Sequence, residues 1–120
     1  MRVKKFLFIL SQSPHDGLWV QETLDILLTV AAFDQPVSLL FLDQGVFQIK
    51  KHQNSELINL KNTAAIFKAL EIYDIQDIFS EVESLQEYGL KPGDLFLPVK
   101  EIYRKELPLF IKKFDIVCSN

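Results

Sequence analysis

The sequence has 120 residues, of which 48% are hydrophobic and 24% are charged, and its formal net charge at pH 7 is −3. This length and composition predict one globular domain, residues 1–120, with an apolar core. The acidic balance and the scattered basic doublets disfavour direct binding of nucleic acid, which needs a basic surface.

The chain begins with a basic segment and a short apolar run, residues 6–10 (FLFIL). Five apolar residues are too few for the core of a signal peptide and far too few for a membrane span, which needs about 20 residues. The single cysteine, Cys118, rules out a disulfide framework and suits a reducing compartment. We therefore expect a cytoplasmic protein that does not enter a membrane.

Residues 6–10 show no alternation of apolar and polar positions, which is typical of a strand buried on both faces of a parallel sheet. Apolar residues at helical spacing predict an amphipathic helix over residues 18–33. Residues 37–42 (VSLLFL) predict a second buried strand, which the chain enters through Pro36.

A turn at residues 43–45 (DQG) leads into VFQI. We expect Asn62 to cap a helix that runs to about Tyr73, and we place a third strand within residues 75–82. A short helical piece then follows and is ended by Gly89.

We place a fourth strand at residues 95–99, a last helix that starts near Pro108, and a closing strand at residues 115–118. Strands and helices therefore alternate with short links. This order predicts an α/β domain with a parallel sheet of about five strands and helices on both faces.

The loop SQSPHDG, residues 11–17, is the first candidate site. A Ser–His–Asp triad is disfavoured, because triads draw their members from distant segments. A phosphate or flavin cradle fits the end of a strand before a helix, but Asp16 brings negative charge, Pro14 lacks an N–H group, and the glycine motifs are absent. A turn that starts the helix is the favoured interpretation.

Other chemistry has little support in the sequence. His15 and His52 are the only histidines, and they show no metal-ligand spacing. Cys118 is either a reactive thiol or, as we favour for a terminal strand, a small buried hydrophobe. Paired acids near a strand–helix junction, Glu81, Glu83 and Glu87, could serve acid–base chemistry but are more typical of a solvated face. We predict no catalytic, cofactor or metal site.

Residues 64–73 (AAIFKALEIY) are apolar almost all round, so they must be buried on more than one side. Either a second subunit or the chain's own loop, residues 45–60, provides the second cover. On the first alternative, we predict that Phe47 and one or more of Ile66, Phe67 and Ile72 lie in a subunit interface.

Five blocks carry a family resemblance over essentially the whole chain: SQSPHDGLWVQETLD, FLDQGVFQI, ALEIYDIQDI, SLQEYGL and KKFDIV. With these blocks the chain resembles the DsrE/DsrF-like sulfur-relay proteins, and within them the TusC/DsrF branch. The order of GVFQ after a buried strand, an IYDI block and a SLxxxGL block is the most specific part of the match.

The resemblance implies a flavodoxin-like domain that assembles with homologous TusB-like and TusD-like subunits as a dimer of heterotrimers. That complex would pass persulfide sulfur, through a downstream TusE-like acceptor, for 2-thiolation of the wobble uridine of tRNA. The family's sulfur-carrying cysteine belongs chiefly to the TusD/DsrE subunit, and its position falls at Glu81 here. The resemblance therefore implies a non-catalytic subunit; the rival hypothesis is a flavin- or nucleotide-binding protein that uses loop 11–17.

Overall fold

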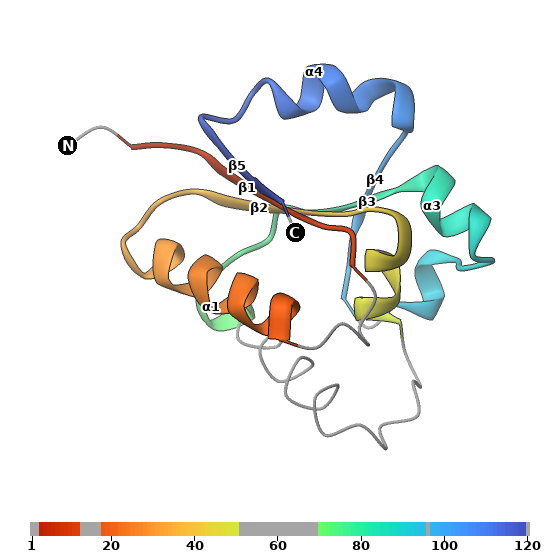
Figure 1. The fold of residues 1–120 in the computed structure, drawn as a ribbon, viewed down its shortest axis with the longest axis horizontal. Helices are drawn as coiled ribbons and strands as arrows, with labels where there is room; N and C mark the ends of the chain where they lie inside the picture. Colours follow the sequence, from red (N-terminus) through yellow and green to blue (C-terminus); the bar gives the residue numbers. More distant parts are fainter. Residues whose placement is uncertain (1–2, 13–17, 51–69, 96, 120) are drawn as a thin grey trace.

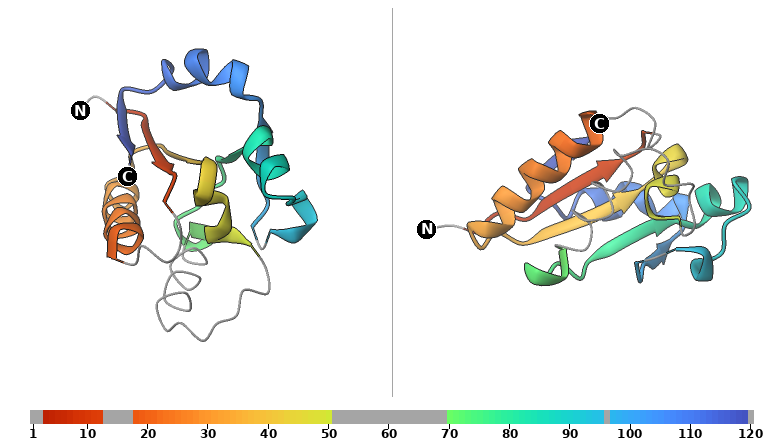
Figure 2. Two further views of the ribbon diagram at one scale, coloured as in Figure 1. Left: turned by 45° about the vertical axis from the view of Figure 1, so that its right-hand side comes forward. Right: turned by 90° about the horizontal axis from the view of Figure 1, so that it is seen from below.

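A parallel sheet of five strands forms the centre of the molecule in a computed structural model, which describes residues 3–12, 18–50, 70–95 and 97–119 (Figure 1). The strand order is β4-β3-β2-β1-β5. The strands span Phe6–Leu10 (β1), Val37–Phe41 (β2), Ile78–Glu81 (β3), Lys100–Ile102 (β4) and Ile116–Ser119 (β5). Every pairing between neighbouring strands is parallel, as the arrowheads in Figure 2 show for β1, β2 and β3. The predicted fold class is confirmed.

The two central strands are the most apolar, because both of their faces are covered. All five residues of β2 are buried, and β1 is buried from Leu7 to Leu10. Phe6 of β1 lies opposite Val37 of β2 on one side and Ile116 of β5 on the other. This position explains why β1 has no polar residue.

The sheet separates two apolar clusters of unequal size. On the first face, Phe8, Leu39 and Ile78 join a large cluster that includes Leu27 of helix α1 (Leu18–Ala32). On the second face, Leu7, Ile9 and Leu40 join a smaller cluster with Ile102 and Leu107, and Leu107 opens helix α4 (Leu107–Ile111). Helices α1 and α4 therefore lie on opposite faces of the sheet, as Figure 1 shows.

Short helical segments follow the strands at their carboxyl ends. The 3-10 helix η2 spans Asp43–Ile49 after β2, and the helix α3 spans Val82–Glu87 directly after β3. Gly89, with φ of 68°, lies just beyond α3, as expected of a helix terminator. Two further 3-10 segments, η3 (Pro92–Asp94) and η4 (Arg104–Glu106), flank β4, and Pro108 lies in the first turn of α4.

The predicted fourth strand at residues 95–99 is wrong. Leu95 makes only an isolated antiparallel bridge to Lys50, and pairing with β3 begins at Lys100, opposite Phe79. The apolar side chains of Leu95 and Leu97 are buried in the large cluster, but Pro98 between them and the strand has no N–H group to donate. The apolar run therefore packs as a loop.

The other predicted elements agree with the structure within one or two residues. Residues 70–72 are helical, so the helix expected to reach Tyr73 ends at Ile72, and its start near Asn62 lies outside the described residues. Among the residues that the structure describes, no helix has the length and hydropathy required to cross a membrane.

Candidate functional site

A buried carboxylate lies at the carboxyl end of the sheet. Glu81 ends β3 and precedes α3, and only 3% of its surface is exposed. Side chains alternate along a strand, so Glu81 and Phe79 are directed to the α4 face while Ile78 and Ser80 face the large cluster. In open α/β folds this edge of the sheet is where ligands bind.

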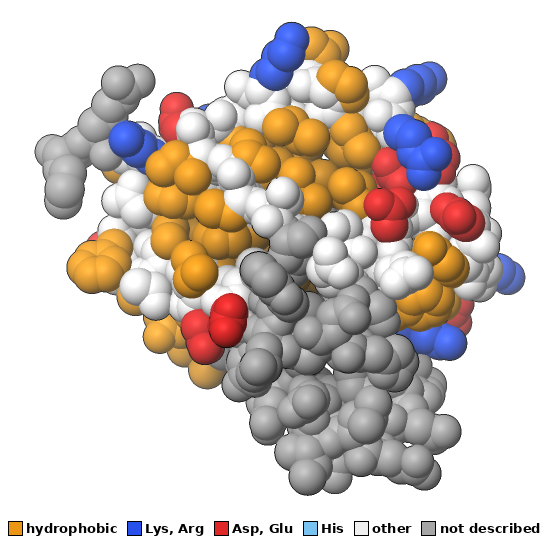
Figure 3. Space-filling view, viewed as in Figure 1, with side chains coloured by type: hydrophobic (Ala, Val, Ile, Leu, Met, Phe, Trp, Pro, Cys, Tyr) orange, Lys and Arg blue, Asp and Glu red, His pale blue; other side chains and the backbone are white. Residues whose placement is uncertain are grey.

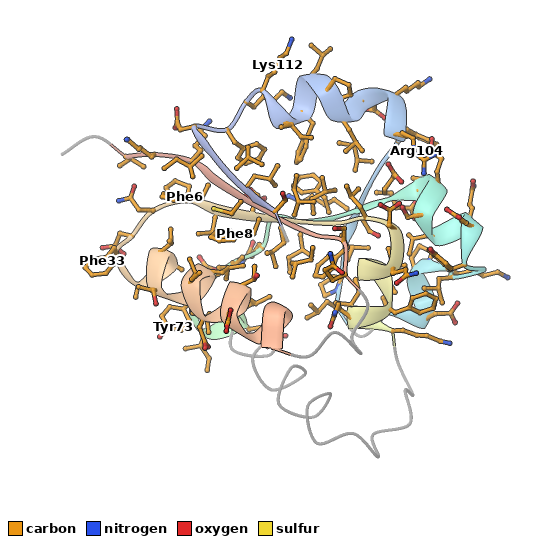
Figure 4. The ribbon with its side chains drawn as sticks, in the orientation of Figure 1. Phe6, Phe8, Phe33, Tyr73, Arg104 and Lys112 are labelled. Atoms are coloured by element: carbon orange, nitrogen blue, oxygen red, sulfur yellow. The ribbon has the colours of Figure 1, made fainter. Side chains whose placement is uncertain are left out.

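Arg104, the first residue of η4 after the neighbouring strand β4, holds the Glu81 carboxylate. Its Nη2 donates to Glu81 Oε1 at 2.9 Å, and its Nε donates to Glu81 Oε2 at 3.2 Å. This two-pronged geometry is the strong form of an arginine–carboxylate pair. The Arg104 backbone N–H also donates to Glu83 Oε1 at 2.9 Å, so the segment after β4 is tied to α3 twice. Figure 4 shows Arg104 beside the start of α4.

Ser84 extends this network to β2. Its hydroxyl donates to Glu81 Oε1 at 2.6 Å and accepts the backbone N–H of Asp43 at 2.8 Å. Asp43 has a φ of 49°, a left-handed conformation that aspartate tolerates better than most residues. The ends of β2, β3 and β4 are therefore linked by Asp43, Glu81 and Arg104, with Ser84 between them.

The network fixes the charge of Glu81. Burial alone would raise the pKa of this carboxyl, but the hydrogen bonds from Arg104 and Ser84 and the attraction of the guanidinium outweigh burial and lower the pKa below its ordinary value. The same carboxylate raises the pKa of Arg104. An ionised, fully held carboxylate at neutral pH has no proton to give and is poorly suited to take one.

Of the other candidate residues, Glu83 contributes to this network, whereas Cys118 lies elsewhere in the sheet. Ser13, His15, Asp16 and His52 lie outside the described residues. Cys118 is half-buried in β5, opposite Phe8 in the middle of β1, and packs against the large cluster. Among the described residues, no group of His, Cys, Asp or Glu side chains could hold a metal ion.

Of the predicted interface residues, the structure describes Phe47 and Ile72. Phe47 of η2 is half-buried against the large cluster, and its ring meets Tyr88 edge-on at a centroid distance of 4.8 Å. Ile72 is 82% exposed. Ile66 and Phe67 lie outside the described residues.

The sequence analysis singled out Glu81 but missed Arg104. The two residues are 23 positions apart, and nothing in the local pattern around Arg104 indicates its partner. Only the adjacency of β3 and β4 in the sheet, and the correct position of β4, brings them together.

Comparison with known proteins finds similarity over nearly the whole chain. A model of the DsrE/DsrF-like family matches residues 4–117. Protein TusC homolog of Pseudomonas aeruginosa is 35% identical over 97% of this chain and 98% of its own length. Protein TusC of Buchnera aphidicola subsp. Baizongia pistaciae is 35% identical over 98% of this chain and 99% of its own length. Intracellular sulfur oxidation protein DsrF of Allochromatium vinosum is 37% identical over 78% of this chain and 68% of its own length.

Solved structures agree with the fold. The crystal structure of the ychN protein from E. coli superposes with a TM-score of 0.76 at 13% identity, and it covers 98% of this chain and 100% of that one. A protein from Methanobacterium thermoautotrophicum, MTH1491, superposes with a TM-score of 0.62 at 9% identity over 98% of this chain and 99% of its own. At these identities the likeness concerns the fold alone.

Proposed function

This chain belongs to the DsrE/DsrF-like family, and from that premise we propose that it is a non-catalytic subunit of a sulfur-relay complex. The complex would pass persulfide sulfur toward 2-thiolation of the wobble uridine of tRNA. The observation that carries the non-catalytic role is the state of Glu81, an ionised carboxylate enclosed by Arg104 and Ser84.

Sulfur transfer through a persulfide requires an accessible thiolate. In this proposal Glu81 stands at the position of the sulfur-carrying cysteine of the TusD-like subunit, as the family resemblance implies, and a carboxylate cannot carry a persulfide. Cys118 is half-buried in the edge strand β5, opposite Phe8 of β1, and lies away from the network at the ends of β2, β3 and β4. The chain's own residues therefore support a partner role in the relay.

The proposed partners are homologous TusB-like and TusD-like subunits, arranged as a dimer of heterotrimers, with a TusE-like acceptor downstream. We propose that Phe47 and one or more of Ile66, Phe67 and Ile72 contribute to one of the interfaces. The exposure of Ile72 supports this proposal, because an aliphatic side chain left 82% exposed gains from burial by a partner.

The test of the function is a gene deletion combined with nucleoside analysis. Without this chain, mass spectrometry of hydrolysed tRNA should show loss of 2-thiouridine, and a plasmid copy should restore it. A Cys118→Ser copy should restore it equally well, because the thiol of Cys118 carries no sulfur in this proposal. Normal 2-thiouridine in the deletion strain would contradict the proposal.

Two outcomes identify rival functions. Failure of the Cys118→Ser copy, together with one added sulfur atom on Cys118 after incubation with a persulfide donor, would indicate a self-sufficient sulfurtransferase. Flavin absorbance in the purified chain would favour a flavin-binding protein that uses loop 11–17.

A further inference from the structure

A groove runs along α4 on the face of the sheet opposite α1, and we call it the α4 groove. Its volume is about 430 Å³, and its lining comprises Ile102, Lys105, Glu106, Leu109, Phe110 and Lys113. Ile102 is buried and Phe110 is half-buried, whereas Leu109 is 71% exposed at the rim. The groove is therefore apolar inside and incompletely covered.

The lining of this groove has a surplus of positive charge. Lys105 and Lys113 are exposed, and neither ammonium group takes part in an ion pair among the residues that the structure describes. The carboxylate of Glu106 also lines the groove, and its Oε1 accepts the Tyr103 backbone N–H at 3.4 Å, so the lining carries two positive charges and one negative charge. This local surplus of positive charge contrasts with the net charge of −3 for the whole chain.

A second hollow adjoins the α4 groove. It has a volume of about 270 Å³, shares Lys113 with the groove, and is lined on its inner side by Phe79 and Phe114. Figure 3 shows hydrophobic side chains at the surface between α4 and the sheet, with basic side chains around α4. Helix α4 has only five residues, so this face is thinly covered along much of its length.

We propose that the α4 groove docks an acidic segment of a neighbouring subunit in the relay complex, an inference that rests on the proposed function. An apolar side chain of that segment would lie against Leu109 and Phe110, while flanking carboxylates would pair with Lys105 and Lys113. Unpaired ammonium groups beside an apolar floor complement such a segment in both charge and polarity.

The position of the groove also fits a subunit that has two different partners. Phe47 packs with the large cluster on the α1 face, whereas the α4 groove lies on the opposite face. Each face can therefore serve a separate neighbour. RNA is the less favoured occupant, because phosphates would pair with the lysines but leave Leu109 exposed.

The test compares charge reversal at two adjacent lysines, Lys113→Glu and Lys112→Glu. Both change the net charge equally, but only Lys113 lines the groove, and Figure 4 shows Lys112 directed away from the sheet. Binding of each full-length variant to the purified, co-expressed homologous subunits would be measured by calorimetry. At about 0.05 M salt we expect Lys113→Glu to weaken binding about tenfold or more, and Lys112→Glu to change it less than about threefold.

A Leu109→Ser variant tests the apolar contact, and it should weaken binding at low and high salt alike. Circular dichroism should show that Lys113→Glu, Lys112→Glu and Leu109→Ser are all folded, because the three side chains are exposed. If the wild-type chain binds the homologous subunits and the two lysine variants weaken binding equally, the α4 groove is not the docking site, although the proposed function still stands. Failure of the wild-type chain to bind any homologous subunit would overturn the proposed function and this inference together. If Lys113→Glu instead loses binding to tRNA and binds the subunits as the wild type does, the groove is a binding site for RNA.

Discussion

Glu81 is the residue on which the carboxyl end of the sheet depends. Its two carboxylate oxygens accept three hydrogen bonds, one from Ser84 and two from Arg104. A buried carboxylate without these donors would be costly, so the three groups form one unit. The side chain of Arg104 is 57% exposed, so solvent screens its charge, and the hydrogen bonds matter more than the long-range attraction.

Glu81→Gln should make the protein less stable at neutral pH but not in acid. The folded-state pKa of Glu81 lies below its unfolded value, so its stabilising contribution is present above the unfolded pKa of about 4.3 and is lost as pH falls through the folded pKa. We expect the variant to lower the free energy of unfolding by about 1–3 kcal/mol at pH 7, the value of hydrogen bonds to a charged group. The difference should shrink below pH of about 4, as measured by urea unfolding across pH.

The control for this prediction is Glu87→Gln, at an exposed position in α3, the helix that follows Glu81. It should leave stability at pH 7 within about 0.5 kcal/mol of the wild type. Equal effects of the two variants would show that the Glu81 network contributes nothing specific.

At the scale of elements, apolar patterning predicted the buried strands but not the edge. Residues 7–10 and 37–41 are buried on both faces, so hydrophobicity alone located β1 and β2. The edge strand β4 reads KEI, with two exposed residues, and therefore resembles a loop, whereas the apolar loop before it resembles a strand. The Glu81–Arg104 pair depended on that edge strand, and for this reason it could not be predicted.

Close packing of η2 on the end of β1 requires a glycine at position 45. A methyl group on Gly45 would overlap the carbonyl oxygen of Leu10. The Leu42 N–H donates to that same oxygen at 3.1 Å, so the backbone has little freedom to move away. Gly45→Ala should therefore lower the free energy of unfolding by about 3 kcal/mol, as measured by chemical denaturation.

The matched control is Gly93→Ala in η3, where an added methyl group meets nothing within 4 Å. Its stability should stay within about 0.5 kcal/mol of the wild type. A similar loss for both variants would mean that a general property of glycine, and not the contact with Leu10, decides the outcome.

At the scale of the whole molecule, each face of the sheet carries an apolar cluster, and the helices cover the two clusters to different extents. The α1 face has the larger cluster and the exposed Ile72, and the α4 face has the smaller cluster and the α4 groove. A subunit enclosed by two different neighbours needs two surfaces of this kind.

Ile72→Glu should release the chain from its complex without changing its fold. The side chain is 82% exposed, so the substitution leaves the core intact, and a buried charge would oppose assembly. Co-expression with the homologous subunits, followed by size exclusion, measures the effect. Phe47→Glu is expected to release the chain as well, but with some loss of stability, because Phe47 packs on Tyr88 and the core.

Val3→Glu provides the control, since Val3 is 56% exposed at a different place, before β1. This variant should remain in the complex. Retention of Ile72→Glu in the complex would place Ile72 on the free surface and remove it from the interface.

The pairing of β1 with β5 has a kinetic consequence. Lys5 and Asp115, which are joined beside this pairing by a backbone-to-carboxylate hydrogen bond, are 110 positions apart. Closing so long a loop is entropically costly, and β5 offers only four residues in return, two half-buried and two exposed. Folding should therefore join β2 to β1 early and add β5 late. Helix α4 is joined to the sheet by β4 on one side and β5 on the other, so until both helix and β5 have packed, Leu7, Ile9 and Leu40 are incompletely covered, and we expect such an intermediate to be prone to aggregate.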